Sequence, residues 1–464
     1  MTSLTRRSFL AAAGSAVVSP AVAAPAPAGD TEVVIVGAGA AGIAAARRLA
    51  AANRRFVLVE ASDRVGGRCI TDTSTFGVPF DLGAHSIYSP DTNPVAKVAG
   101  GGKLDIYRAP TGQRVRIGRR NARESEMEDF LTALVKANRA IGDASRSKTD
   151  MHAAQVLPRD LGDWKPAIDF MLGPYTCAAD LNEVSAMDLG RAAERDTAAF
   201  CRQGLGTLLT SLAAGIPVRL DTAVTQIDTR NTRGRAEVRT TKGMLSGRYV
   251  IVTAPAAVLA ADKISFLPEL PKRQRDALAM LKPGSLDHVA LEMPDNPLGL
   301  QRDDLVFEKA AGRPTAALLA NVSATPLAVV TVGGQHGREL AAGGEKTLVG
   351  FATDWLAGLY GADIRKAIRR TRATNWNAAP WIMGAMATAG PGGQPSRRAL
   401  TEPIRDRLYF AGEATHETQW GTVGGAWESG ERAAEAILRR MGVLKEPVER
   451  KPERAPRRRQ RNPT

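Results

Sequence analysis

The clearest hydrophobic pattern lies near the N-terminus, where an unbroken apolar run is followed by glycines and then by alanine-rich sequence. Residues Glu32–Val36 form a short β-branched run, which is typical of a strand buried on both faces of a parallel sheet. Small residues continue to about Ala52 and predict a helix that packs closely on that strand. The next apolar run, Arg55–Val59, predicts a second strand. This stretch therefore predicts a strand, a tight turn, a helix and a strand.

The rest of the chain carries weaker hydrophobic patterns, some with the period of a helix and some with that of a strand. A charge-rich region, 121–200, has helical periodicity around Glu128–Ile141, and a second helix is predicted at Thr197–Leu212. Further strands are predicted at Val218–Ile227, Arg235–Thr241, Gly247–Thr253, Leu305–Phe307, Ala317–Val322, Ala328–Val332 and Thr347–Phe351, and further helices at Lys272–Leu281 and Asp363–Arg372. The later strands predict a mixed sheet that lines a substrate cavity.

Glycines at the first turn give the N-terminal unit a chemical role. Gly37, Gly39 and Gly42 form G-x-G-x-x-G at the start of the helix, whose free N–H groups can bind a pyrophosphate. Glu60 follows the second strand, where a carboxylate can accept hydrogen bonds from ribose hydroxyls. A glycine turn alone can be purely structural. With strand, helix and Glu60 in register, the unit predicts a dinucleotide site.

Motifs at both ends of the chain resemble one family. Gly66-Gly67-Arg68 favours a flavin over a nicotinamide cofactor, because two glycines let the backbone approach it and a guanidinium can bind its phosphates. Far downstream, Arg407–Thr415 is a buried strand ending in A-G-E, and Gly421–Ala426 opens another helix. Together these motifs resemble the flavin-containing amine oxidases, which include monoamine and polyamine oxidases and histone-demethylase flavoproteins. The resemblance is close over residues 31–95, 205–292 and 374–440.

The resemblance implies an FAD site. Gly83 and Ala84 would pass close to the isoalloxazine, and the backbone of Val224 would hold the adenine, although Val224 could also lie on an ordinary edge strand. Ala385 stands where covalently flavinylated relatives carry cysteine, so we expect non-covalent FAD. The expected cofactor-binding residues are Gly37, Gly39, Gly42, Glu60, Gly67, Arg68, Gly83, Ala84, Val224, Gly412, Glu413, Thr422 and Val423.

The expected substrate side departs from the family pattern. His288 stands where most relatives have a lysine that holds a water against flavin N5, and a neutral imidazole could slow reaction with dioxygen. A histidine packed between strand and helix is the structural alternative. We expect His288, Trp376 and Trp381 to be the catalytic-site residues, with the tryptophans shaping the cavity.

Two further positions lack the family's aromatic residues. Met386 and Thr422 stand where two tyrosines usually enclose the amine. Trp381, Trp420, Tyr88 and Trp376 are the available substitutes, and His85 and Tyr88 are candidates for the substrate side of the ring, although a buried structural role also fits His85.

These features predict an α/β fold: a doubly wound, Rossmann-like FAD-binding domain interleaved with a mixed-sheet and helical substrate domain. We expect the FAD-binding domain at 30–99, 204–262 and 400–442, and the substrate domain at 100–203 and 263–399. The expected function is amine oxidation or dehydrogenation by hydride transfer from the amine α-carbon to flavin N5. The alternatives are an L-amino-acid oxidase or another FAD oxidoreductase of this fold, and a flavin-binding protein without amine turnover.

The two ends of the sequence bear on where the protein is located. Residues 1–24 contain Thr5–Leu10, TRRSFL, then an apolar run and Ala21-Val22-Ala23, which predict a twin-arginine signal and a periplasmic or secreted enzyme. Part of the net charge of +14 lies in the predicted disordered tail, 443–464, whose alternative role is weak attachment to anionic lipid.

Expected partners follow from the same features. They are a small amine and either dioxygen or a periplasmic electron acceptor. We expect no nucleic acid, because no aromatic residues interleave with the basic ones, and no transmembrane segment. A homodimer is left open. Cys69, Cys177 and Cys201 have no metal-type spacing, so no metal site is expected and at most one disulfide could form.

Overall fold

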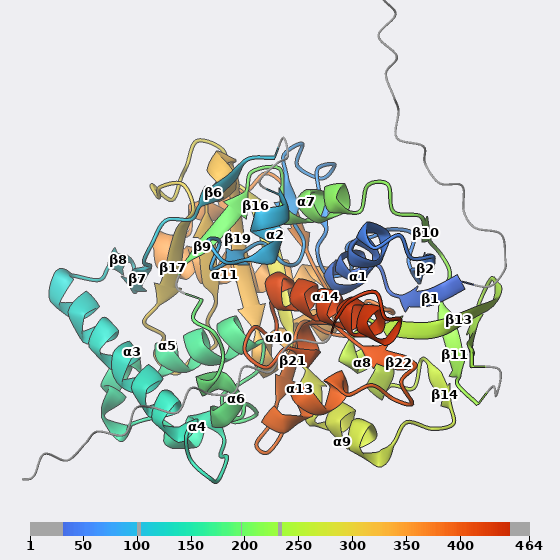
Figure 1. The fold of residues 1–464 in the computed structure, drawn as a ribbon. Coiled ribbons are helices and arrows are strands. Elements are labelled where there is room, and N and C mark those ends of the chain that lie inside the picture. The colour runs from blue at the N-terminus through green and yellow to red at the C-terminus, as the bar shows by residue number, and fades with distance from the viewer. Residues whose placement is uncertain (1–30, 100–103, 196, 231–233, 446–464) are drawn as a thin grey trace, which may run out of the picture.

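Two large β-sheets organise the computed structural model, which describes residues 31–99, 104–195, 197–230 and 234–445 (Figure 1). The predicted signal, 1–24, and the tail from 446 lie outside these residues. The larger sheet has the order β10-β2-β1-β13-β12-β11-β14, with β22 paired to β13. Its strands are β1 (Thr31–Val36), β2 (Phe56–Val59), β10 (Val218–Arg219), β11 (Val224–Asp228), β12 (Ala236–Thr240), β13 (Gly243–Val252), β14 (Ser265–Leu267) and β22 (Leu408–Phe410).

Helices cover both faces of this sheet, which explains the unbroken apolar run in β1. Val33 and Ile35 pack against α1 (Ala40–Ala51) and α14 (Val423–Arg440), which lie side by side on one face (Figure 1). Val34 and Val36 belong to the core on the opposite face. That face is covered by α8 (Ala256–Ala260), α9 (Lys272–Met280) and α13 (Gln394–Thr401). The expected α/β fold class is confirmed.

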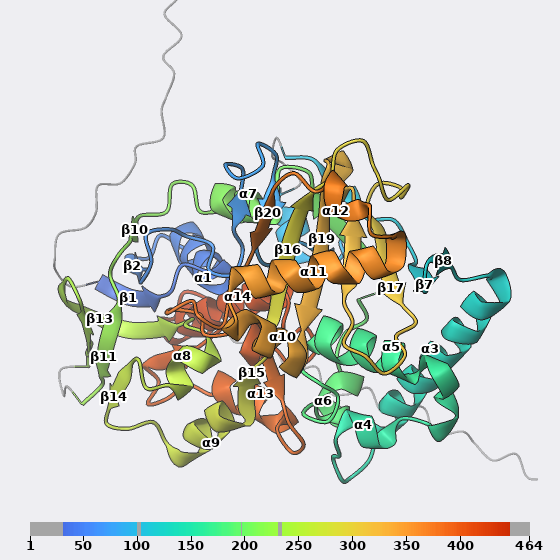
Figure 2. The same cartoon turned by 180° about the vertical axis from the view of Figure 1, so that it is seen from behind.

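The second large sheet has seven strands in the order β20-β16-β19-β18-β17-β7-β8. They are β7 (Arg114–Ile117), β8 (Arg120–Asn121), β16 (Leu286–Glu292), β17 (Asp304–Glu308), β18 (Ala317–Ala320), β19 (Leu327–Gly333) and β20 (Thr371–Ala373). One face packs against α10 (Gly334–Ala342), α11 (Glu345–Tyr360) and α12 (Ile364–Ala367), with α11 crossing the strands in Figure 2. Side chains on the other face, among them Val329 and Thr331, line a large cavity.

A helical region and three small sheets complete the described chain. The helical region contains α3 (Glu124–Ala144), α4 (Ala153–Val156), η1 (Arg159–Trp164), α5 (Lys165–Phe170), η2 (Met171–Tyr175) and α6 (Ala186–Gly190). The small sheets are β5 (Ile87–Tyr88), β9 (Ala198–Cys201) and β6 (Ile106–Arg108); β3 (Thr71–Asp72) and β4 (Phe80–Asp81); and β15 (Leu281–Pro283) and β21 (Ala387–Ala389). The remaining elements are α2 (Pro94–Ala99), α7 (Leu205–Leu212), η3 (Val322–Ala324) and η4 (Glu413–Thr415).

Four local predictions are wrong. Val218–Ile227 is not one strand, because 218–219 forms β10 beside β2 and 224–228 forms β11 beside β12. Thr347–Phe351 is not a strand but part of α11, whose buried face is visible only over a longer window. Thr197–Leu212 is not one helix, because 198–201 forms β9 between β5 and β6, and Gly204, at φ +91°, separates it from α7. Asp363–Arg372 divides into α12 and β20, which pairs with β16.

The expected domain boundaries also need correction. Residues 265–267 form β14 and pair with β11, so the boundary at 262 cuts through the larger sheet. Leu278, Ala389 and Leu400 pack in the core of that same sheet, because α9, β21 and α13 cover its face. The part of the chain assigned to the substrate domain therefore includes segments that belong to the dinucleotide-binding fold. The remaining division stays a prediction.

Candidate active site and cofactor cleft

One cavity of about 1080 Å³ extends from the glycine-rich turn after β1 to the helical region. Residues of both large sheets line it, together with the loops at 60–69, 83–88, 376–386 and 412–423. All expected site residues except Gly42 line this cavity, so the structure brings together motifs from the two ends of the chain. Gly42 lies inside α1, where the absence of a side chain lets the carbonyl of Gly37 come close.

The glycines at the start of α1 allow close backbone approach. A Cβ on Gly42 would overlap the carbonyl oxygen of Gly37, and Gly37 itself has φ +98°. A Cβ on Gly67 would lie 3.3 Å from the Cα of Gly39, so the two glycine loops meet at the cavity wall. Gly39 is the N-cap of α1 and makes no side-chain capping bond, and no acidic residue lies in the first turn. These open N–H groups fit a dinucleotide pyrophosphate.

Glu60 is held in place at the end of β2. Its Oε2 accepts a hydrogen bond from the backbone N–H of Ala38 at 2.7 Å, and its Oε1 accepts from Ser62 N–H and Oγ at 2.9 and 2.8 Å. The side chain is buried but lines the cavity. A fixed carboxylate at this position fits the ribose-binding role that the sequence predicts, and that role stays a prediction.

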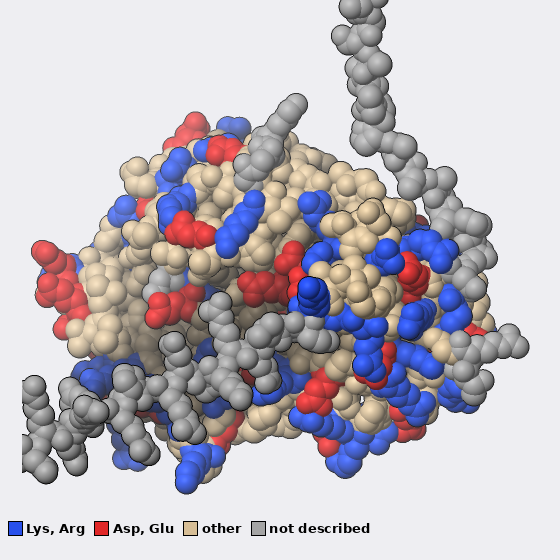
Figure 3. Space-filling view, in the orientation of Figure 1, with Lys and Arg blue, Asp and Glu red and all other residues tan. Residues whose placement is uncertain are grey.

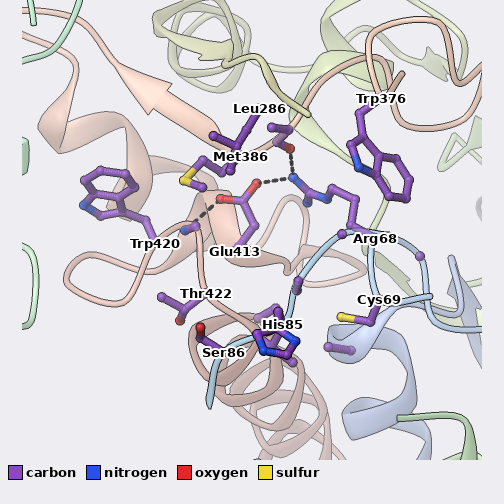
Figure 4. Close-up of a pocket in the computed structure, with 18 of the residues that line it drawn as sticks. Arg68, Cys69, His85, Ser86, Leu286, Trp376, Met386, Glu413, Trp420 and Thr422 are labelled. Atoms are coloured by element: carbon purple, nitrogen blue, oxygen red, sulfur yellow. Dashed lines mark hydrogen bonds and ion pairs between the residues drawn. The ribbon is translucent and has the colours of Figure 1, made fainter. Parts of the chain in front are cut away.

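Arg68 and Glu413 form an ion pair at the centre of the site. Arg68 Nη1 lies 3.0 Å from Glu413 Oε1 and also donates to the carbonyl of Ala385. Glu413 accepts two more hydrogen bonds, from the N–H groups of Ala387 at 3.1 Å and Gly421 at 3.0 Å. Figure 4 shows this pair with Trp376 on the Arg68 side and Trp420 on the Glu413 side. Sequence reasoning assigned both residues to the cofactor and missed their mutual contact.

Gly83 and Trp376 build one wall together. Trp376 N–H donates to Asp287 Oδ1 at 2.9 Å, and its Nε1 donates to the carbonyl of Leu82 at 3.1 Å. A Cβ on Gly83 would overlap the carbonyl of Arg68 and lie 2.9 Å from the Trp376 ring. Ala84 N–H donates to that same Arg68 carbonyl at 3.1 Å. This wall is fixed at several points, so its shape is built in before any ligand binds.

The C-terminal motif presents a second helix N-terminus to the cavity. Thr422 is the N-cap of α14, where its hydroxyl accepts from Gly425 N–H at 2.9 Å, and Val423 begins the helix. Gly412 has φ +130°, a backbone conformation that favours glycine. Val224 lies on β11, between β12 and β14, so the edge-strand alternative is wrong.

Two neighbouring histidines line the cavity. Asp81 Oδ2 is 3.0 Å from His85 Nδ1, and His85 packs on Phe200 with ring centroids 4.2 Å apart. Burial, followed by the charge of His85, lowers the pKa of His288 to about 4, so His288 is neutral at pH 7. His85 Nε2 and His288 Nδ1 are buried with no hydrogen-bond partner in the described part of the chain. Both residues line the cavity, and neither of these nitrogens is held by another protein group.

The tryptophans named as substitutes for the missing tyrosines differ in what they can do. Trp376 is buried in the wall, whereas Trp381 is 39% exposed at the cavity rim. Trp420 is fully buried at 0% exposure, with the guanidinium carbons of Arg397 and Arg195 at 4.6 and 4.9 Å from its ring centroid. Trp420 is thus already occupied by protein cations and is not free to enclose a substrate amine.

Three functional neighbours escaped sequence reasoning. Asp81 joins His85 to α7 by accepting from Leu205 N–H at 3.0 Å. Asp287 positions Trp376, and burial raises the pKa of its carboxyl. Arg195 lines the cavity beside Tyr88. Asp81 lies within the D-x-G-A segment and could have been singled out there, but no pattern marks Arg195.

The two sheets, the paired helix N-termini and the glycine-lined cleft define a flavin-binding oxidoreductase fold. The model of the family described as flavin containing amine oxidoreductase matches residues 40–438, and the chain belongs to that family. The flavin cofactor and the enzyme class expected from the sequence are thereby confirmed.

Relatives in sequence agree with this assignment, and a solved structure shares the fold. Lysine-specific histone demethylase 1B of Mus musculus is 27% identical and covers 88% of this chain, which spans 53% of the demethylase. Polyamine oxidase 4 of Oryza sativa is 26% identical, with 89% of this chain and 90% of the oxidase covered. In structure, cyclohexylamine oxidase from Brevibacterium oxydans has a TM-score of 0.74 at 20% identity, covering 89% of this chain and all of that one.

Proposed function

We propose that this protein is an FAD-dependent amine oxidase or dehydrogenase that binds FAD without a covalent link. The observation that carries the proposal is the single cavity that joins the glycine-lined cleft to a chamber containing His85, His288 and Trp376. Bound FAD would supply the hydride acceptor. The amine would lose a hydride from its α-carbon and a proton from its nitrogen and give an imine, which water hydrolyses to an aldehyde or a ketone with release of ammonia or a smaller amine.

The cysteines support non-covalent binding. Ala385 offers no thiol, and of the three cysteines only Cys69 lines the cavity. Burial raises the pKa of the Cys69 thiol to about 12, so it stays protonated and is a poor nucleophile. The expected cofactor-binding residues would hold FAD through the backbone of the two glycine loops, Glu60, Arg68 and the start of α14.

The chain's own residues would orient the amine and exclude water. Trp376 is fixed by Asp287 and Leu82 and gives the chamber a rigid wall. Neutral His288 can accept or donate a hydrogen bond, so it can hold a water beside the reacting carbon without adding charge. Hydride removal in such a site depends on orientation and desolvation, with no obligatory protein base.

Anaerobic mixing of the purified protein with a panel of amines tests this function. Bleaching of the flavin absorbance by an amine is the expected result, and rapid recovery when oxygen is admitted would identify an oxidase that forms hydrogen peroxide. Bleaching with slow recovery would identify a dehydrogenase that uses another acceptor. No bleaching by any amine or amino acid would contradict the proposed function.

We also propose export to the periplasm by the twin-arginine pathway, which carries folded proteins and suits a cofactor-loaded enzyme. The support is the sequence of residues 1–24. The described residues contain no helix with the length and hydropathy to cross a membrane. The surface of the described residues carries charges of both signs, because on the face shown in Figure 3 basic side chains are interspersed with acidic ones. Fractionation of cells expressing the chain, with Arg6→Lys and Arg7→Lys together as the control, tests the location.

A further inference from the structure

Arg195 places a guanidinium in the wall of the substrate chamber. The residue lies between α6 and β9, is partly buried, and lines the cavity. Its Nη1 donates to the carbonyl of Thr176 at 3.1 Å and its Nη2 to the carbonyl of Trp420 at 2.5 Å. The guanidinium carbon is 5.7 Å from the Tyr88 ring centroid and 4.9 Å from that of Trp420. These contacts hold the group in one place and leave donors free.

No carboxylate among the described residues lies within 4.0 Å of this guanidinium. Two other charged side chains around the cavity are paired within the protein. Arg397, on the Trp420 ring, is paired with Asp188 at 2.7 Å, and Asp303, which lines the cavity, lies 3.3 Å from Arg302. Glu194 lines the cavity but is exposed to solvent. Among the described residues, Arg195 therefore carries a positive charge at the cavity wall that no ion pair within 4.0 Å offsets.

This cation changes what the aromatic wall can bind. An amine enclosed by aromatic faces is attracted to their π-electrons, but here a protein guanidinium occupies that position on Trp420 and lies beside Tyr88. A substrate with a second ammonium group would meet a like charge in a partly desolvated chamber, which is unfavourable. A substrate with an anionic group would instead form charge-assisted hydrogen bonds with the free donors.

We propose that Arg195 binds a carboxylate of the substrate, so that the enzyme oxidises amines that also carry a carboxylate, that is, amino acids. This inference rests on the proposed amine-oxidising function and specifies its substrate class. The recognised group is the carboxylate, and α-amino acids and ω-amino acids both present one. The number of carbons between nitrogen and carboxylate would decide which of the two reaches Arg195.

Flavin bleaching in the holoenzyme with matched series of compounds tests the proposal. Each series keeps one carbon skeleton and compares the amino acid, its amide and the amine without the carboxylate, for L-α-amino acids and for ω-amino acids of increasing length. The best amino acid is expected to bleach the flavin at least tenfold faster, at low concentration, than its neutral counterpart. Diamines of equal length are expected to be the poorest substrates.

Three variants locate the effect. Arg195→Gln removes a charged hydrogen bond and is expected to lower the second-order rate of flavin bleaching by the amino acid about tenfold to a hundredfold. The same rate for the neutral amine is expected to change by no more than about twofold. Arg195→Lys keeps the positive charge but lacks the paired N–H donors of a guanidinium, and it is expected to recover part of the rate. Arg191→Gln is the matched control, because Arg191 is exposed, bonds Gln394 at 2.9 Å and does not line the cavity.

A binding measurement separates this inference from the proposed function. Titration with a simple carboxylic acid that cannot be oxidised, such as propionate or benzoate, is expected to perturb the flavin spectrum of the wild type and of Arg191→Gln but not of Arg195→Gln. Carboxylate binding without bleaching by any amine or amino acid would overturn the function and leave the carboxylate site intact. Faster bleaching by neutral amines than by amino acids, with Arg195→Gln unaffected, would overturn the inference alone.

Discussion

The guanidinium of Arg68 lies 3.0 Å from the carboxylate of Glu413, although 345 residues separate them in sequence. The carboxylate is buried, while the Arg68 side chain is 26% exposed toward the cavity. Because Glu413 also accepts from the N–H groups of Ala387 and Gly421, it fixes the loops on both sides of the cofactor cleft. The shape of the cleft therefore depends on a contact between segments from opposite ends of the chain.

Removing Glu413 should therefore lower the stability of the protein and its retention of FAD. Glu413→Ala leaves two backbone N–H groups and Arg68 without their acceptor, which costs about 2–4 kcal/mol of unfolding free energy. The variant should also lose FAD more readily, which gel filtration and the flavin-to-protein absorbance ratio would show. Glu417→Ala, at an exposed position four residues away, should retain both stability and flavin. Equal flavin content in the two variants would contradict the assigned role.

His288 makes stability depend on pH in a defined direction. Its folded-state pKa of about 4 lies below the ordinary value of 6.5 because burial disfavours the charged ring. Between these values the unfolded chain binds the proton and the folded chain does not, so stability falls as pH drops from 6.5 toward 4. The loss from this group is about 3 kcal/mol. Urea unfolding at pH 7 and pH 4.5 should show a smaller difference for His288→Asn than for the wild type.

Restoring the family's usual residue should change the reaction with oxygen. A charged amine beside the flavin would stabilise the negative charge that develops when electrons pass to dioxygen. His288→Lys should therefore raise the bimolecular rate of reoxidation by about tenfold, with a smaller effect on flavin bleaching. Stopped-flow mixing of the reduced protein with oxygenated buffer measures this rate. An unchanged rate would show that residue 288 does not control the choice of electron acceptor.

The glycines can be tested with a matched pair. Gly42→Ala places a methyl group against the carbonyl of Gly37, so the variant should lose FAD binding or fail to fold. Gly358 lies in the last turn of α11, where a Cβ would contact nothing within 4 Å. Gly358→Ala should stabilise the protein by about 0.5–1 kcal/mol because alanine loses less backbone entropy in a helix. Thermal unfolding and flavin content together distinguish the two.

A fully buried ion pair anchors α13 to α6. Arg397 donates to both oxygens of Asp188 at 2.8 and 2.7 Å and to the carbonyls of Ala387 and Ala414. Asp188→Ala leaves the guanidinium buried without its anion and should cost about 3–5 kcal/mol. Asp160→Ala, at an exposed pair with Lys136, is the comparison and should cost no more than about 1 kcal/mol. Chemical denaturation of both variants gives the difference.

Local pattern was enough to predict the strand, turn, helix and strand of the N-terminal unit. The residues from β1 to Glu60 are consecutive, and both the apolar run and the glycine spacing report directly on backbone geometry. The short apolar run at Thr347–Phe351 was misread as a strand because five residues do not reveal a helical period. The segment at 265–267 was assigned to the wrong domain because its partner strand, β11, lies far upstream.

The substrate chamber was less predictable than the cofactor cleft. Trp420 is aromatic and close to the family motif, so it qualified as a substitute in sequence, yet two arginines from distant segments occupy its ring. Arg195 and Asp287 act through contacts with single partners, and such pairs leave no repeating pattern along the chain. Where function depends on the meeting of two isolated residues, only the folded structure reveals it.

The position of β22 and α14 has a consequence for biosynthesis. β22 completes the parallel strands beside β13, and α14 packs on α1, so segments far downstream close the cleft that β1 and α1 open. We therefore expect FAD to be retained only once residues 408–440 have been synthesised, and a product that stops before Leu408 should be colourless.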